Sequence, residues 1–128
     1  MIQERRDTTI FSGTYKGHQL IIREMIWDRL IGEKLLGKNY YCGYAELLPE
    51  DNYFDHIDEA EDELQVYGGI TYTEYQGHLY ALPEGKSFVG FDTAHASHSH
   101  FTFSMVKQDC FSLIDQIIDK NNNLGMLM

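Results

Sequence analysis

Short runs rich in apolar β-branched and aromatic residues, separated by turn residues, occupy much of the first 95 positions, and these runs predict β-strands. Residues 9–15 and 18–26 flank a glycine, so we interpret them as a β-hairpin, although 19–31 also fits an amphipathic helix. A third strand is expected over 39–48, because Pro49 follows it and has no N–H for a sheet ladder. Three further strands are predicted at 69–76, 78–82 and 87–94, whereas the acid-rich stretch 50–63 is expected to be a loop with one exposed helical turn.

The hydrophobic period changes near residue 103, where apolar residues begin to recur every three or four positions. They are Phe103, Val106, Cys110, Leu113, Ile114, Ile117 and Ile118. This spacing is typical of an amphipathic helix with one buried face. Ser104 is expected to cap its start, and the run 121–123 with Gly125 to end it. The sequence therefore predicts an α+β fold, in which an antiparallel sheet of about five or six strands is covered by one long C-terminal helix.

Length and composition fit a single domain over residues 1–128. Of the 128 residues 43% are apolar, and no internal repeat or Gly/Ser-rich linker divides them. No apolar run is long enough to span a membrane, and the N-terminus lacks the apolar segment of a secretory signal. We expect a monomer in the cytoplasm, with its two cysteines reduced.

The charge is strongly negative and unevenly distributed. The net charge is −10, and residues 39–85 contain eleven acidic residues but no Lys or Arg. Sequence-independent binding to nucleic acid needs cations that neutralise phosphates, so direct nucleic-acid binding by this region is disfavoured. A basic protein surface is the favoured partner.

The same region combines acidic residues with eight of the nine tyrosines. Because a strand buries one face, several of these rings are expected at the surface, where tyrosine is common in binding sites. The expected partner-binding residues are Tyr53, Asp55, Asp58, Glu59, Glu61, Asp62, Glu63 and Tyr67. The alternative interpretation is a solvated loop that only keeps the protein soluble.

A second candidate site is the histidine-rich stretch that follows the last predicted strand. Its possible metal ligands are Asp92, His95, His98 and His100. Zinc takes imidazole nitrogens and carboxylate oxygens, usually four in a tetrahedron, so the sequence predicts a structural zinc ion here. The alternative is a solvated loop without a metal. The remaining histidines, His18, His56 and His78, are expected to be ordinary surface residues.

Three short motifs resemble a group of small phage and prophage proteins. They are Cys42-Gly43-Tyr44, Gly68-Gly69-Ile70-Thr71-Tyr72 and Gly90-Phe91-Asp92-Thr93-Ala94-His95. The resemblance implies that Asp92 and His95 are metal ligands, together with a histidine that precedes the Gly-Gly pair. Here Tyr67 stands at that position, which leaves His98 or His100 as the third ligand.

The chain also resembles, in size and acidity, the anti-CRISPR proteins directed at type II effector nucleases. This resemblance implies a phage-encoded inhibitor in the host bacterial cytoplasm, which binds such a nuclease stoichiometrically and blocks DNA loading or cleavage. The chain lacks a phosphate-binding glycine loop, a Gly-x-Ser-x-Gly elbow and a His-Glu-x-x-His helix, so it is not expected to be an enzyme. The alternative is a small metal-dependent hydrolase of a nucleotide or phosphoester, with Glu46 or Glu74 as its base.

Overall fold

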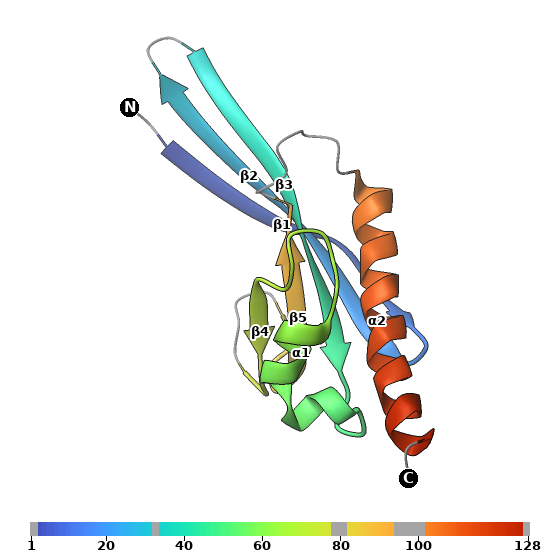
Figure 1. Ribbon diagram of the computed structural model, residues 1–128. Coiled ribbons are helices and arrows are strands. Elements are labelled where there is room, and N and C mark those ends of the chain that lie inside the picture. The colour runs from blue at the N-terminus through green and yellow to red at the C-terminus, as the bar shows by residue number, and fades with distance from the viewer. Residues whose placement is uncertain (1–2, 32–33, 78–81, 94–101, 127–128) are drawn as a thin grey trace.

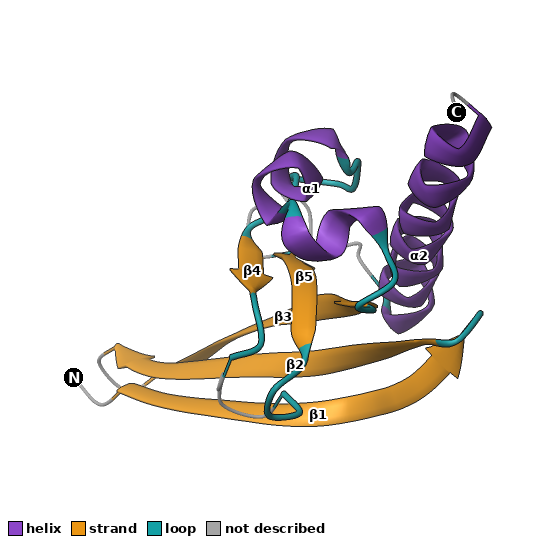
Figure 2. Ribbon diagram, turned by 90° about the horizontal axis from the view of Figure 1, so that it is seen from below, coloured by secondary structure: helices purple, strands orange, loops and turns teal. Residues whose placement is uncertain are grey.

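The computed structural model describes residues 3–31, 34–77, 82–93 and 102–126, and it has the predicted α+β fold (Figure 1). Its elements are β1 (Gln3–Tyr15), β2 (His18–Ile31), β3 (Lys34–Leu47), the 3-10 helix η1 (Asn52–Asp55), α1 (Ile57–Glu63), β4 (Tyr72–Glu74), β5 (Ser87–Asp92) and α2 (Phe103–Met126). The five strands form one antiparallel sheet in the order β1-β2-β3-β5-β4. Both α1 and α2 lie on the same side of the long strands (Figure 2).

The predicted hairpin is confirmed, and the helical alternative for 19–31 is wrong. β1 and β2 meet at a turn in which Lys16 and Gly17 have φ angles of +49° and +82°. Successive residues of β2 face opposite sides of the sheet and are buried on both, since Leu20 and Ile22 pack toward α2 and Ile21 packs on the far face. The polar residues of 19–31 recur every four or five positions, which also suits one face of a helix, so the hydrophobic pattern did not separate a strand from a helix; they are Gln19, Arg23, Glu24, Asp28 and Arg29.

The first three strands are longer than predicted. β5 pairs with only the second half of β3, from Cys42 to Leu47. The other half of the β1-β2-β3 ribbon continues past β5 and projects from the body of the protein (Figure 1).

The predicted helix covers the sheet with the predicted face. Its fully buried side chains are Val106, Cys110, Leu113, Ile114 and Ile117. Both cysteines are free, as expected. They lie on opposite faces of the sheet, and burial raises the pKa of the Cys110 thiol to about 12.

Both ends of α2 differ from the prediction. The hydroxyl of Thr102, rather than that of Ser104, accepts the Met105 N–H at 3.2 Å and caps the helix. At the other end, the asparagine run lies inside the helix, because α2 continues to Met126. Asn121 makes tertiary hydrogen bonds, described below, that offset its poor helix propensity.

The acid-rich stretch is more ordered than the predicted loop, because it contains η1 and the two-turn helix α1. Three of its side chains, Tyr53, Phe54 and Ala60, reach the core together with the following Leu64 and fix the stretch against α2 and the sheet. β4 and β5 are shorter than predicted, and the strand expected at 78–82 lies almost entirely outside the described residues. Within the described part of the chain, no helix is long and apolar enough to cross a membrane.

The packing of α2 yields a test of the fold. Ile117→Ala removes a fully buried side chain and is expected to lower the free energy of unfolding by about 2–5 kcal/mol. Asp119→Ala changes an exposed residue of the same helix and is expected to stay within about 0.5 kcal/mol of the parent. Equilibrium urea denaturation measures both, and equal effects would contradict this placement of α2.

Candidate functional site

The three motifs of the phage resemblance meet where β3, β4 and β5 pair. The first and third motifs run side by side, with Cys42 opposite Asp92, Gly43 opposite Phe91, and Tyr44 opposite Gly90. The second motif lies on the other side of β5, where the Thr71 N–H donates to the Gly90 carbonyl at 2.9 Å and Tyr72 pairs with Gly90.

The two motif glycines make room for aromatic rings. A Cβ atom on Gly43 would lie 2.7 Å from the Phe91 ring and 2.8 Å from the Cys110 sulfur, and one on Gly90 would lie 2.7 Å from the Tyr44 ring. These distances are shorter than real Cβ contacts, so neither strand accepts a larger residue here. The described part of the motifs is therefore explained by packing at the centre of the sheet.

Asp92 lies at the end of this assembly and is held by its neighbours. Its Oδ2 accepts a hydrogen bond from the Thr71 hydroxyl at 3.1 Å. The next residue, Thr93, donates its N–H to the Tyr41 carbonyl, and its hydroxyl accepts the Tyr41 N–H, both at 2.9 Å. The backbone is thus fixed up to the point where the histidine-rich stretch begins.

The other predicted metal ligands, His95, His98 and His100, lie outside the described residues. Among the described residues, no three His, Cys, Asp or Glu side chains form a group able to hold a metal ion. Tyr67, which stands where the phage group has a histidine, is 49% exposed and lines a shallow depression with the first turns of α2. The zinc ion stays a prediction.

The residues named for a hydrolase have other roles in the structure. Glu46 is buried, accepts the Gln19 N–H at 2.8 Å and lies 3.5 Å from the Lys86 ammonium. Glu74 accepts the Tyr72 hydroxyl at 2.7 Å. Each carboxylate therefore binds a structural partner.

The predicted acidic surface is present. We call it the acidic face, and it consists of Asp55, Asp58, Glu59, Glu61, Asp62 and Glu63, all exposed. Within the described chain, only Glu63 has a cationic partner, the Lys120 ammonium at 2.8 Å. This ion pair and the Tyr53 hydroxyl, which donates to Glu63 at 2.7 Å, lower the pKa of Glu63. The other five carboxylates have no ion pair in the described residues.

The expected exposure of Tyr53 is wrong, because only 3% of the residue is exposed and its ring packs in the core. Tyr67 is exposed as predicted. Sequence reasoning missed Tyr75, which is 48% exposed and donates its hydroxyl to Asp55 Oδ1 at 3.0 Å. The signal for Tyr75 was its place directly before the Gln76-Gly77 turn.

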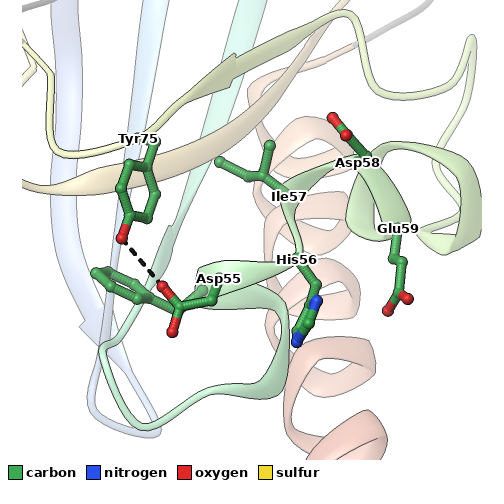
Figure 3. Close-up of a pocket in the computed structure, with 7 residues that line it drawn as sticks. Asp55, His56, Ile57, Asp58, Glu59 and Tyr75 are labelled. Carbon is green, nitrogen blue, oxygen red and sulfur yellow. Dashed lines mark hydrogen bonds between the residues drawn. The ribbon is translucent and has the colours of Figure 1, made fainter.

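Tyr75 and the start of the acidic face enclose a shallow depression of about 470 Å³ (Figure 3). Its lining comes from η1, from α1 and from the end of β4. The lining residues are Phe54, Asp55, His56, Ile57, Asp58, Glu59 and Tyr75. The Phe54 and Tyr75 rings are in contact, with centroids 5.2 Å apart. This arrangement combines an aromatic wall with three carboxylates.

His18, predicted to be a surface residue, is instead buried against Asp51. Its Nε2 lies 2.7 Å from Asp51 Oδ2 and its Nδ1 lies 3.0 Å from the Lys16 carbonyl. Both partners are acceptors, so both ring nitrogens donate and the imidazole is protonated. Burial alone lowers the pKa of His18, but the bonds to Asp51 and Lys16 outweigh it and raise this pKa above its ordinary value.

Asp51 connects this histidine to α2. Its Oδ2 also accepts the Leu48 N–H, and its Oδ1 accepts the Asn121 side-chain amide, both at 2.8 Å. Burial raises the pKa of Asp51, whereas these bonds and His18 lower it, with a net decrease. Asn121 in turn accepts the Asn52 N–H at 2.7 Å. The network holds the segment that leads into α1 between the hairpin turn and the end of α2.

A first test of the site concerns the metal. Protein purified without a histidine tag is expected to contain about one zinc ion, and EDTA is expected to lower its Tm by roughly 5–10 °C if the ion contributes about 2 kcal/mol. His95→Ala is expected to abolish zinc binding, while His56→Ala, at an exposed histidine remote in sequence, keeps it. A metal content near zero by elemental analysis would refute the zinc site.

A second test concerns the pH dependence of stability. Because the folded pKa of His18 is raised, its contribution is complete below about pH 6.5 and is lost as pH rises through the folded pKa. Because the pKa of Asp51 is lowered, its contribution is present above about pH 4 and is lost as pH falls. Urea unfolding from pH 3 to 9 should show the pair contributing most between these limits.

His18→Gln is the matching variant, because glutamine keeps a hydrogen-bond donor but no charge. It is expected to lower the free energy of unfolding by about 3–5 kcal/mol at pH 6. It should also remove part of the loss of stability that the parent shows above pH 6.5. An unchanged pH profile in the variant would mean that His18 is not charged in the folded protein.

Comparison of the chain with protein-family models, with curated proteins and with solved structures finds no match. The resemblance to small phage proteins therefore stays a prediction. The residues described above are the basis for the function proposed next.

Proposed function

We propose that the protein is an anti-defence inhibitor that binds a basic surface of a type II CRISPR effector nuclease through its acidic face. One inhibitor molecule occupies one effector and blocks DNA loading or cleavage. The observation that carries the proposal is the acidic face itself, since only one of its six carboxylates, that of Glu63, forms an ion pair within the described residues.

Electrostatics supports a basic protein as the partner. Such effectors hold the guide–target duplex in a positively charged channel, and DNA must reach this channel before cleavage. Closely spaced carboxylates repel one another, and docking on cations removes this repulsion while it steers the approach of the two proteins. Nucleic acid, in contrast, is repelled by the same face.

The structure also supports binding without a large rearrangement. The acidic face sits on short helices whose inner sides are buried, with Ala60 fully buried and Leu64 4% exposed. The Lys120–Glu63 ion pair and the Asp51–Asn121 hydrogen bond hold both ends of this segment on α2. A surface fixed before binding loses little conformational entropy on association.

Charge reversal tests the proposal. Asp58→Lys combined with Glu61→Lys changes the net charge by +4 on the acidic face, and we expect association with a type II effector to slow by about 10–100-fold. The matched control is a set of four exposed positions on β1 with the same total change of +4: Thr8→Lys, Ile10→Lys, Ser12→Lys and Thr14→Lys. We expect this control to stay within about threefold of the parent, because the charge lies away from the acidic face.

Association is measured by surface plasmon resonance at several salt concentrations, alongside a DNA-cleavage assay with stoichiometric inhibitor. The parent should bind more slowly as salt rises, since exposed charges are screened beyond a Debye length of about 8 Å. If the acidic-face variant inhibits cleavage as well as the parent does, the proposal is wrong.

A further inference from the structure

We infer that the depression beside α1 receives an arginine side chain of the partner protein. The inference rests on the proposed function, since it names the group that would dock at one place on the acidic face. It uses a feature that the rest of the acidic face lacks, an aromatic wall inside a concave surface.

The wall is formed by Phe54 and Tyr75, whose rings lie 5.2 Å apart with an angle of 55° between their planes. Phe54 is 9% exposed and belongs to the core, so its contact ties the Tyr75 ring to a fixed part of the protein. The Tyr75 hydroxyl is held by Asp55 Oδ1 at 3.0 Å, and this bond raises the pKa of Tyr75. The exposed Tyr75 ring is therefore held by a ring contact and by a hydrogen bond, and it offers a flat surface to a ligand.

The charges around the wall are negative and spread across the depression. Figure 3 shows Asp55 and Tyr75 on one side of Ile57, with Asp58 and Glu59 on the other. None of these three carboxylates has an ion pair in the described part of the chain. A cation that enters the depression thus meets a ring and a carboxylate on one side and two carboxylates on the other.

Arginine fits this combination better than lysine. A guanidinium is planar, so it stacks on a tyrosine ring while its N–H groups donate to a carboxylate in the same plane. Asp55 Oδ2 makes no hydrogen bond within the described residues, and it is the acceptor placed next to the ring. A lysine ammonium is more strongly hydrated and cannot stack, so it gains only the charge attraction.

The shape of the depression also favours a side chain over a free small molecule. Sites that enclose small ligands bury most of the ligand surface, whereas this depression is shallow and open to solvent. An arginine presented by a protein brings further contacts outside the depression, where Glu61 and Asp62 continue the acidic face along α1. Tyrosine and arginine are also the residue types that contribute most to protein interfaces.

Two capped peptides test the inference, one with four Gly-Arg repeats and one with four Gly-Lys repeats. Fluorescence anisotropy at low salt is expected to give about three- to tenfold tighter binding of the Gly-Arg peptide to the parent protein. Tyr75→Leu removes the ring and is expected to reduce this preference to less than twofold. Tyr75→Phe keeps the ring without its hydroxyl and is expected to retain most of the preference.

Glu61→Gln is the control on the acidic face outside the depression. It is expected to weaken both peptides by the same factor and leave their ratio unchanged. Thermal unfolding of each variant, monitored by circular dichroism, verifies that the fold is kept. Equal binding of the two peptides to the parent, or an unchanged ratio in Tyr75→Leu, overturns the inference.

Failure of the inference can be distinguished from failure of the proposed function. If an effector binds with the expected charge dependence while the arginine preference is absent, the acidic face is the interface and the depression holds no arginine. If the arginine preference depends on Tyr75 but no type II effector is bound, the depression is a real arginine site and its partner belongs to another class of basic protein.

Discussion

The buried ion pair between His18 and Asp51 is the interaction on which the arrangement of this protein depends most. Removing two charges from water costs several kcal/mol per ion, and the attraction between them offsets this only if the remaining donors and acceptors are also satisfied. Here Asp51 accepts three hydrogen bonds and His18 donates two. The partners come from the hairpin turn, the loop after β3 and the end of α2, so the pair forms only when all three are in place. The position of the acidic face follows from it.

A second constraint acts at the centre of the sheet. Gly43 and Gly90 lie on neighbouring strands, and each leaves space for an aromatic ring, Phe91 in one case and Tyr44 in the other. Tyr44 then contacts Tyr72 edge-on at 5.7 Å, which fixes the short edge strand β4. This packing accounts for the two glycines and for the tyrosines beside them without assigning them chemistry.

The sequence was most informative where one period persisted over many residues. The spacing of apolar residues in α2 predicted its buried face, and two β-prone runs around a glycine predicted the hairpin. Shorter elements gave weaker patterns: α1 has only Ala60 buried within its seven residues, too few to define a period. Burial of His18 and Tyr53 was not predictable, because it depends on partners far away in the sequence, Asp51 and α2. The acidic face was predictable because exposure is the default for carboxylates.

The positions of the lysines explain why most carboxylates of the acidic face have no ion pair among the described residues. Each lysine with a described side chain has a partner: Lys16 pairs with Asp115, Lys86 with Glu46 and Lys120 with Glu63, and Lys107 lies over the Phe11 ring at 4.4 Å. Only Lys120 reaches the acidic face, and it pairs with the carboxylate that already contacts Tyr53. Mutual repulsion among the other five carboxylates lowers the free energy of unfolding. The buried side chains of the same segment, Ala60 and Leu64, offset this loss. A rigid surface that carries unneutralised charge gains more binding free energy from a partner's cation than a mobile surface does, because its carboxylates are already in position when the partner arrives.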